Sequence, residues 1–389
     1  MFEYFPDNYT WSLATMLAIN CLDHANMSEI DDACRPLKGL AKVNDDAAQS
    51  AWYESWKRVG ERIEGLADSD KAAGHRLSAG RKYLRACVYY LVADRMVTNL
   101  DSRKIGIYKK ALHVFREGVT LRRDPVEFVE VPFQGASLPA LFVPAKGGAR
   151  APCIIHFDGF DVMKEILYLN NMGDEFGRRG VALLLVDHPG VGEALRLRNM
   201  HLTPETELPA IACVDYLETR HDVDPERIGM MAVSMGGYYG TRAAAFEKRI
   251  KCCVAWGAMW NVGEQLERTF VTGRLGQTRS VPPFQLLWVF GKETAEEAIA
   301  VAKTMTLDKI IDKVTCPLLV MHGENDRQVP LSYAEKTIQA AVNSPVRKLK
   351  VFTKAEGGAE HCQVDNGSLA VDCATDWVAE ILGAYPEGV

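Results

Sequence analysis

From about residue 125 onward, short apolar stretches take turns with amphipathic stretches along the chain. PCIIHF (152–157) and VALLLV (181–186) each have the length and composition of one buried strand. ILYLNNMGDEFGRRG (166–180) and ELPAIACVDYLETR (207–220) instead space their apolar residues as a helix does. Parallel strands need such crossover helices, which cover the faces of the sheet. The alternation therefore predicts an α/β fold with a mostly parallel, doubly wound sheet.

The first part of the chain follows a different pattern. Three stretches there place apolar residues at helical spacing and never at strand-like alternation: 45–67, 71–96 and 104–121. After them, VEFVEVPF (126–133) and LPALFVPA (138–145) alternate on either side of a turn at Gly135, which predicts a β-hairpin. We therefore expect a helical N-terminal cap domain over 1–124 and an α/β domain over 125–389.

Charge and cysteine usage exclude several classes of protein. The formal net charge is −6, so no basic surface points to nucleic acid. The apolar runs are too short to span a membrane, and MFEYFPDNYTWSL at the N-terminus lacks the basic segment of a secretory signal. The 10 cysteines show no metal-type spacing, which favours buried free thiols in a reducing compartment. We expect a cytoplasmic protein that binds neither nucleic acid nor membrane and holds no metal.

The motif AVSMGG (232–237) lies where a strand, RIGMMAVS, is expected to end and a helix to begin. An A-x-S-x-G sequence in that context is typical of a nucleophile elbow, a tight turn that exposes the serine hydroxyl at the edge of the sheet. Ala232 stands where the usual motif has glycine, and it is still small. A serine in a glycine-rich turn is the structural alternative. The context favours Ser234 as a nucleophile.

A serine nucleophile needs a histidine base that is itself oriented by a carboxylate. In a strand-to-helix elbow fold, the acid and then the histidine follow the serine along the chain. Asp326 comes directly after the apolar stretch PLLVMHG, in the polar loop ENDRQVP. His361 follows the last expected strand, KLKVFT, in a glycine-rich loop. We therefore predict a catalytic triad of Ser234, Asp326 and His361.

Acyl chemistry also needs two backbone N–H groups that stabilise a developing oxyanion. One is expected from Met235, the residue after the nucleophile. The other is expected from the loop FDGFD (157–161), where Phe160 follows a glycine. The predicted oxyanion hole is therefore formed by the backbone amides of Met235 and Phe160.

The motifs FDGFDVMKE, DHPGVGE, SMGGYY, HGENDRQVP and GGAEHC together resemble those of the α/β-hydrolase superfamily. Within it, the chain is most similar to the 2,6-dihydroxypseudooxynicotine hydrolase group. That group is related to the fermentation–respiration switch protein and to fungal yellowish-green polyketide-shortening hydrolases. The resemblance covers about residues 125–385, and the helical N-terminal region is similar only in layout. It implies an α/β-hydrolase fold with a helical N-terminal domain.

The resemblance also implies a reaction, the hydrolysis of a carbon–carbon bond next to a ketone. Ser234 would attack the carbonyl carbon, His361 would take the serine proton, and Asp326 would hold the imidazole. A member of the group has an additional glutamate near the site, after the sixth strand. The corresponding segment here, WNVGEQLER (260–268), offers Glu264 or Glu267 as the auxiliary acid. A solvated helix face is the alternative role for each.

The stretch from about 258 to 312 is long for a connection between a strand and a helix, and it is mostly helical and rich in aromatic residues. It is typical of a lid inserted over a pocket. Packing within the lid is the default role of its aromatic side chains. Together with the N-terminal helices, a lid would enclose an apolar cavity suited to an aromatic or polyketide-like small molecule. Trp260 and Tyr238 are the candidates for substrate contact near the elbow.

Aromatic residues of the N-terminal helices are further candidates. Helices laid over a catalytic domain often form a wall of its pocket, although an aromatic stripe at helical spacing usually belongs to a core. The candidates for substrate contact are Trp52, Tyr53 and Tyr83.

Other functions share these motifs. The same triad would serve a carboxylesterase, an amidase or an acyltransferase, because each acts on an acyl carbon. A binding or regulatory protein on a hydrolase scaffold is an alternative of another class, but it would have no need of the base. No metal or organic cofactor is implied, because the triad supplies the nucleophile and the base. An exposed helical region is compatible with a homodimer.

Overall fold

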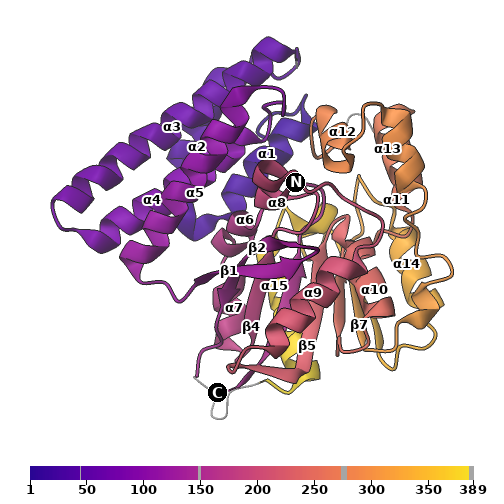
Figure 1. The fold of residues 1–389 in the computed structure, drawn as a ribbon. Helices are drawn as coiled ribbons and strands as arrows, with labels where there is room; N and C mark the ends of the chain where they lie inside the picture. The colour runs from indigo at the N-terminus through magenta and orange to yellow at the C-terminus, as the bar shows by residue number, and fades with distance from the viewer. Residues whose placement is uncertain (44, 148–149, 273–277, 385–389) are drawn as a thin grey trace. The chain divides into compact units, whose positions relative to one another are not determined.

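The computed structural model describes residues 1–43, 45–147, 150–272 and 278–384. Its contacts divide these residues into two compact units (Figure 1). The helical unit contains Met1–Pro125 together with two short segments, 168–171 and 278–285. The sheet unit contains the remaining described residues.

The helical unit is built on three long helices that run side by side (Figure 1). Its helices are α1 (Tyr9–Asn20), α2 (Met27–Cys34), α3 (Asp46–Ala72), α4 (Arg76–Asp94) and α5 (Ser102–Arg122). Side-chain caps explain where two of the long helices, α3 and α5, begin. Asp45 accepts a hydrogen bond from the backbone N–H of Ala48 at the start of α3, and Asp101 accepts one from Arg103 at the start of α5.

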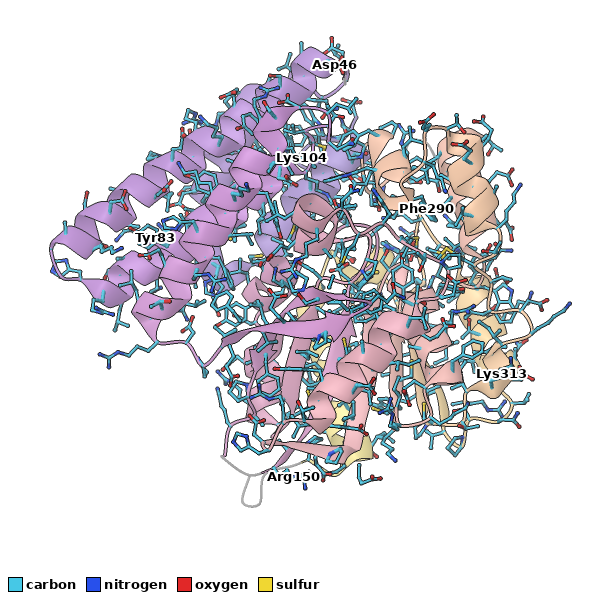
Figure 2. All side chains as sticks on the ribbon, viewed as in Figure 1. Asp46, Tyr83, Lys104, Arg150, Phe290 and Lys313 are labelled. Atoms are coloured by element: carbon cyan, nitrogen blue, oxygen red, sulfur yellow. The ribbon has the colours of Figure 1, made fainter. Side chains whose placement is uncertain are left out.

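The core of the helical unit combines aromatic packing with one buried ion pair. The indole rings of Trp11, Trp52 and Trp56 follow one another at centroid distances of 5.0 and 5.5 Å. Lys104, labelled in Figure 2, is fully buried, and its Nζ lies 3.2 Å from Asp94 Oδ2. The same ammonium donates to two backbone carbonyls at 2.9 Å, so its charge is paired and hydrogen-bonded as burial requires.

The sheet unit contains an eight-stranded sheet with the order β1-β2-β4-β3-β5-β6-β7-β8. Antiparallel pairing is confined to β1 with β2 and β2 with β4, and the remaining neighbours are parallel. The strands are β1 (Glu127–Phe133), β2 (Ala136–Val143), β3 (Ala151–Phe157), β4 (Ala182–Val186), β5 (Val223–Val233), β6 (Cys253–Trp256), β7 (Leu318–Gly323) and β8 (Arg347–Phe352). This arrangement confirms the predicted fold class, including the hairpin. All residues of β3, β4, β6 and β7 are buried, because helices cover both faces.

Helices α9 and α10 pack on one face of the sheet, and α7 and α15 pack together on the other (Figure 1). The helices of this unit are α6 (Lys164–Leu169), α7 (Met172–Arg178), α8 (Gly192–Arg198), α9 (Glu207–Glu218), α10 (Gly236–Phe246), α11 (Val262–Leu266), α12 (Phe284–Phe290), α13 (Ala295–Ala302), α14 (Leu331–Ala340) and α15 (Gly367–Leu382). The first residues of α12 and the last of α6 are grouped with the helical unit.

Two connections differ from the sequence-based expectation. The stretch 166–180, expected as one helix, is broken at Asn171, which has a left-handed backbone with φ of 60°. Asparagine adopts this conformation more easily than most residues, so α6 ends and α7 begins there. In the expected lid, 258–312, the described part contains α11, a π-helical turn (Glu267–Val271), α12 and α13. Residues 273–277 of that stretch lie outside the described residues.

Within the described ranges, no helix is both long enough and apolar enough to cross a lipid bilayer. All ten cysteines fall in these ranges and are unpaired; all are buried except Cys362 and Cys373, which are half-buried.

Candidate active site

Ser234 occupies a sharp turn between β5 and α10. Its backbone has φ of 62°, the left-handed conformation that is uncommon outside glycine. The turn is held by two backbone hydrogen bonds, from Ser234 N to Trp256 O at 2.7 Å and from Gly237 N to Ser234 O at 2.8 Å. Strain of this kind persists only where the surroundings enforce it, and it is the geometry of a nucleophile elbow.

Close packing around the turn explains its small residues. A Cβ added at Gly237 would lie 2.0 Å from Gly257 O, at the end of the neighbouring strand β6. Helix α10 therefore starts directly against the backbone that follows β6. This contact holds Ser234, directly after β5, at the edge of the sheet where the parallel strands end.

Ser234, His361 and Asp326 form a continuous chain of hydrogen bonds. Ser234 Oγ lies 2.8 Å from His361 Nε2, and His361 Nδ1 lies 2.7 Å from Asp326 Oδ2. The other carboxylate oxygen of Asp326 accepts from the backbone N–H groups of Gln328 at 2.8 Å and Val329 at 2.9 Å. The carboxylate is thereby oriented by its own loop. Ser234 is half-buried, whereas His361 and its partner carboxylate are buried.

The charges of this pair reinforce each other. Burial works against the imidazolium of His361, but the negative charge of Asp326 outweighs it and raises the pKa of His361 well above 6.5. Burial likewise opposes ionisation of Asp326, yet the attraction of His361 and the hydrogen bonds to the carboxylate lower its pKa. The lowered pKa of Asp326 favours its ionised form, and the raised pKa of His361 favours proton uptake by the imidazole.

Two side chains at this site were not predicted from the sequence. His322, in β7, places Nε2 3.6 Å from Asp326 Oδ2 and 3.0 Å from Val329 O. Its Nδ1 accepts from the backbone N–H of Ala258, which assigns the proton to Nε2. Cys362 places its Sγ 3.4 Å from His361 Nε2, the same nitrogen that faces Ser234. Their positions at a strand end and beside the predicted base are the only signals the sequence offers.

The loop after β3 meets the elbow at Gly159. A Cβ at this position would lie 2.6 Å from Val233 O, 2.7 Å from Ser234 Cβ and 3.0 Å from Met235 N. The backbone at Gly159, directly before Phe160, therefore lies in contact with the elbow residues that end at Met235. Met235 N and Phe160 N are the two predicted oxyanion donors. Their role as an oxyanion hole stays a prediction.

The same loop is anchored by a buried ion pair. Asp161, with φ of 56°, accepts from Arg196 Nη2 at 2.8 Å and from the backbone N–H of Gly192 at 3.3 Å. The Arg196 guanidinium lies over the ring of Trp288, 5.1 Å from its centroid. These contacts fix the backbone immediately after Phe160.

We predict that Gly159→Ala lowers kcat by on the order of 10²-fold, because a Cβ there displaces the elbow from the oxyanion loop. The overpacking should also cost roughly 1–3 kcal/mol of stability, measurable by denaturant unfolding. Gly106→Ala is the matched control, since nothing lies within 4 Å of a Cβ at that position. Full activity in Gly159→Ala would show that the close contact has no bearing on turnover.

Two of the predicted pocket residues lie in the sheet unit. Trp260 is buried, and Lys336 Nζ lies 4.3 Å from its ring centroid. Tyr238 is fully buried; its hydroxyl donates to Pro204 O at 3.2 Å and accepts from Arg242 Nη1 at 3.2 Å. These three contacts are with other residues of the protein, and a substrate contact by either Trp260 or Tyr238 stays a prediction.

The other predicted pocket residues lie in the helical unit. Trp52 is part of the indole cluster, and its Nε1 donates to Val92 O at 2.9 Å. The ring of Tyr53 lies under the Arg103 guanidinium, 4.9 Å from centroid to carbon. The hydroxyl of Tyr83, labelled in Figure 2, donates to Asp68. Their contact with a substrate also stays a prediction.

The two candidates for an auxiliary acid differ in their surroundings. Glu264 is exposed in the first turn of α11. Glu267 pairs with Lys303 Nζ at 2.9 Å, with both side chains partly exposed. Between them, Gln265 is buried and donates to Gln328 O, two residues beyond Asp326. A catalytic role for Glu264 or Glu267 stays a prediction.

Comparisons with known proteins agree with this architecture. The model of the prolyl oligopeptidase family matches residues 177–384, and that of the FrsA-like esterases matches residues 47–264. The α/β-hydrolase xenA of Xenoacremonium sinensis is 29% identical over 381 residues, 87% of each chain. The 2,6-dihydropseudooxynicotine hydrolase of Paenarthrobacter nicotinovorans is 25% identical over 351 residues, 89% of this chain and 88% of that one.

A solved structure extends the likeness to the three-dimensional fold. The crystal structure of the 2,6-dihydroxy-pseudo-oxynicotine hydrolase superposes with a TM-score of 0.75 and 24% identity. The match covers 94% of this chain and 95% of the other. At 24% identity, the superposition shows a shared fold.

Proposed function

This chain belongs to the α/β-hydrolase family and is an enzyme, and we propose that it is a serine hydrolase that cleaves a carbon–carbon bond next to a ketone. The substrate class is an aromatic or polyketide-like small molecule. One observation carries the proposal: Ser234 Oγ, His361 and Asp326 are joined by hydrogen bonds of 2.8 and 2.7 Å at the end of the parallel strands.

The reaction begins with proton transfer from Ser234. His361 Nε2 takes the hydroxyl proton as Oγ attacks the ketone carbon, and Asp326 stabilises the resulting imidazolium through Nδ1–H. The carbonyl oxygen becomes an oxyanion, which the backbone N–H groups of Met235 and Phe160 stabilise. The product of this step is a tetrahedral adduct on Ser234.

Carbon–carbon cleavage follows when the adduct collapses. The carbonyl re-forms, the bond to the α-carbon breaks, and its electron pair leaves on that carbon. The imidazolium of His361 returns its proton to the departing carbanion. A second ketone delocalises the electron pair as an enolate, and a hydroxylated aromatic ring does so from its keto tautomer, which is why such substrates suit this chemistry. The remaining acyl group is an ester of Ser234.

Water completes the cycle. His361 takes a proton from water while the hydroxide attacks the acyl-enzyme, and the second tetrahedral adduct releases a carboxylic acid. The serine oxygen recovers its proton from the imidazolium. The balance is one ketone and one water converted to one acid and one protonated carbon fragment, with no oxidant or reductant.

The ketone class is supported by the sequence motifs and by the relatives. One relative that spans most of this chain is named for the hydrolysis of 2,6-dihydropseudooxynicotine, and another is an α/β-hydrolase. The family descriptions also favour a second candidate, hydrolysis of esters or amides, because one matching family is of esterases and the other of oligopeptidases. Ester hydrolysis would use the same steps with an alkoxide as leaving group.

A direct assay separates these candidates. The purified protein is incubated with a 1-aryl-1,3-diketone, a 2,6-dihydroxyphenyl alkyl ketone and p-nitrophenyl esters, and acid release is followed by chromatography. The proposal expects cleavage of at least one ketone, with both fragments recovered in equal amounts. Rapid ester turnover without ketone cleavage would instead identify an esterase.

A further inference from the structure

The loops that carry Asp326 and His361 are tied together by the carboxylate of Glu360. Asn325 donates from Nδ2 to Glu360 Oε1 at 2.9 Å, and Arg327 donates from Nε to Glu360 Oε2 at 2.9 Å. These two residues flank Asp326, and Glu360 directly precedes His361. The side chain of Glu360 thus binds both neighbours of the proposed acid, while its backbone is peptide-bonded to the proposed base.

The backbone of Glu360 is held separately from its side chain. Its N–H donates to Asp365 Oδ1 at 3.1 Å, and the N–H of Ala359 donates to Asp365 Oδ2 at 3.0 Å. Asn325 N also donates to Ala359 O at 2.9 Å. The strands β7 and β8 are parallel neighbours, so these contacts join two loops that leave the same edge of the sheet.

The hydrogen bonds accepted by the Glu360 carboxylate are strong because the carboxylate is charged and buried. Glu360 is 5% exposed, and its ion-pair partner Arg327 has a side chain that is 31% exposed. Hydrogen bonds with ionised groups are shorter and stronger than neutral ones. The distance that they protect, 2.7 Å from Asp326 Oδ2 to His361 Nδ1, tolerates little displacement.

We propose that Glu360 is a positioning residue that keeps Asp326 at hydrogen-bonding distance from His361. This inference rests on the proposed function, since it assigns Glu360 a role through the triad. It does not depend on which acyl compound is the substrate. A loop residue with only a structural role would affect stability without changing the acid–base behaviour of His361.

The decisive variants are Glu360→Ala and Glu360→Gln, compared with Glu356→Ala. Glu356 lies in the same loop region but is exposed, and it contacts Lys350 and Thr353 instead of the acid loop. For Glu360→Ala we expect kcat to fall by roughly 10- to 100-fold with KM changed less than about twofold, because the triad loses alignment while binding is retained. In Glu360→Gln, a neutral amide oxygen can still accept a hydrogen bond from one of the two partners. Its kcat should therefore lie between those of Glu360→Ala and the wild type.

A pH profile provides the readout that a structural role would not move. The titratable groups that face the His361 imidazole are Asp326 and Cys362, and His322 Nε2 lies 3.6 Å from the same Asp326 oxygen, Oδ2. Asp326 raises the pKa of His361, so a looser contact lowers that pKa. The acid limb of kcat/KM should therefore shift to lower pH in Glu360→Ala and stay in place in Glu356→Ala.

The controls distinguish the failure of this inference from failure of the proposed function. A fluorophosphonate probe and a p-nitrophenyl ester report on Ser234 whatever the natural substrate. Loss of both signals in Ser234→Ala, with wild-type rates and pH profile in Glu360→Ala, would overturn the positioning role alone. Activity losses that merely track the unfolded fraction would also overturn it. If Glu360→Ala does not fold, Asn325→Ala removes one of the two contacts, and a wild-type kcat in that variant would count against the proposal.

Discussion

Replacing Ser234 with alanine is expected to lower kcat by on the order of 10⁴- to 10⁶-fold, because no other group supplies the attacking oxygen. The substitution removes only Oγ, which faces His361 Nε2 at 2.8 Å. The backbone hydrogen bond from residue 234 to Trp256 O does not involve the side chain, so the elbow and the fold should persist. Steady-state kinetics and fluorophosphonate labelling measure the loss, and thermal unfolding checks the fold.

Ser368→Ala is the matched control for this prediction. Ser368 is exposed near the start of α15, and its hydroxyl contacts only Asn366 among the described side chains. It should keep wild-type turnover and labelling. If Ser234→Ala retained more than about a hundredth of the wild-type kcat, Ser234 could not be the nucleophile of a triad acting as a unit.

The contact among Ser234, Asp326 and His361 is predictable from the sequence because it follows from topology. In a parallel sheet, the carboxyl ends of all parallel strands open at the same edge. Ser234 directly follows β5, Asp326 follows β7, and His361 lies in the loop after β8. An apolar stretch followed by a polar residue marks each of these ends. The residues distant in sequence are therefore brought to one edge.

The supporting contacts of the site are not predictable in the same way. The hydrogen bonds from Asn325 and Arg327 to Glu360 form because β7 and β8 are neighbours and because the two irregular loops after them approach each other. Periodicity contains no information about loop conformation. Likewise, Glu264 and Glu267 have the same chemistry in the sequence. Only the fold shows that Glu267 pairs with Lys303, 36 residues away.

The spacing of apolar residues also does not predict where a helix is interrupted. The pattern over 166–180 is helical throughout, yet the left-handed backbone of Asn171 divides it. The lid stretch shows a related limit, because its residues 278–285 pack with the N-terminal helices rather than with the sheet. Spacing predicts that a segment is helical, but long-range packing decides to which unit the segment belongs.

Asp326→Asn is expected to have the second largest effect, a fall in kcat of about 10⁴-fold at the plateau of the pH profile. In the wild type, Asp326 Oδ2 accepts from His361 Nδ1, which leaves Nε2 free to accept the proton of Ser234. An asparagine amide can donate to Nδ1 and so favour the tautomer with the proton on Nε2. That tautomer cannot serve as the base. Kinetics across a pH series, with Asp308→Asn as an exposed control, measure the loss.

The same substitution should also move the pH dependence, and the direction is set by the charge of Asp326. His361 acts as a base only when neutral, so activity is lost as pH falls through its pKa. Burial lowers that pKa, and the carboxylate of Asp326 raises it well above 6.5, so the wild-type acid limb lies above that value. Without the carboxylate the largest influence that raises the pKa is lost while burial still lowers it, so the acid limb of Asp326→Asn shifts to lower pH. If the acid limb does not move and kcat falls by less than about tenfold, Asp326 neither raises the pKa of His361 nor orients its imidazole.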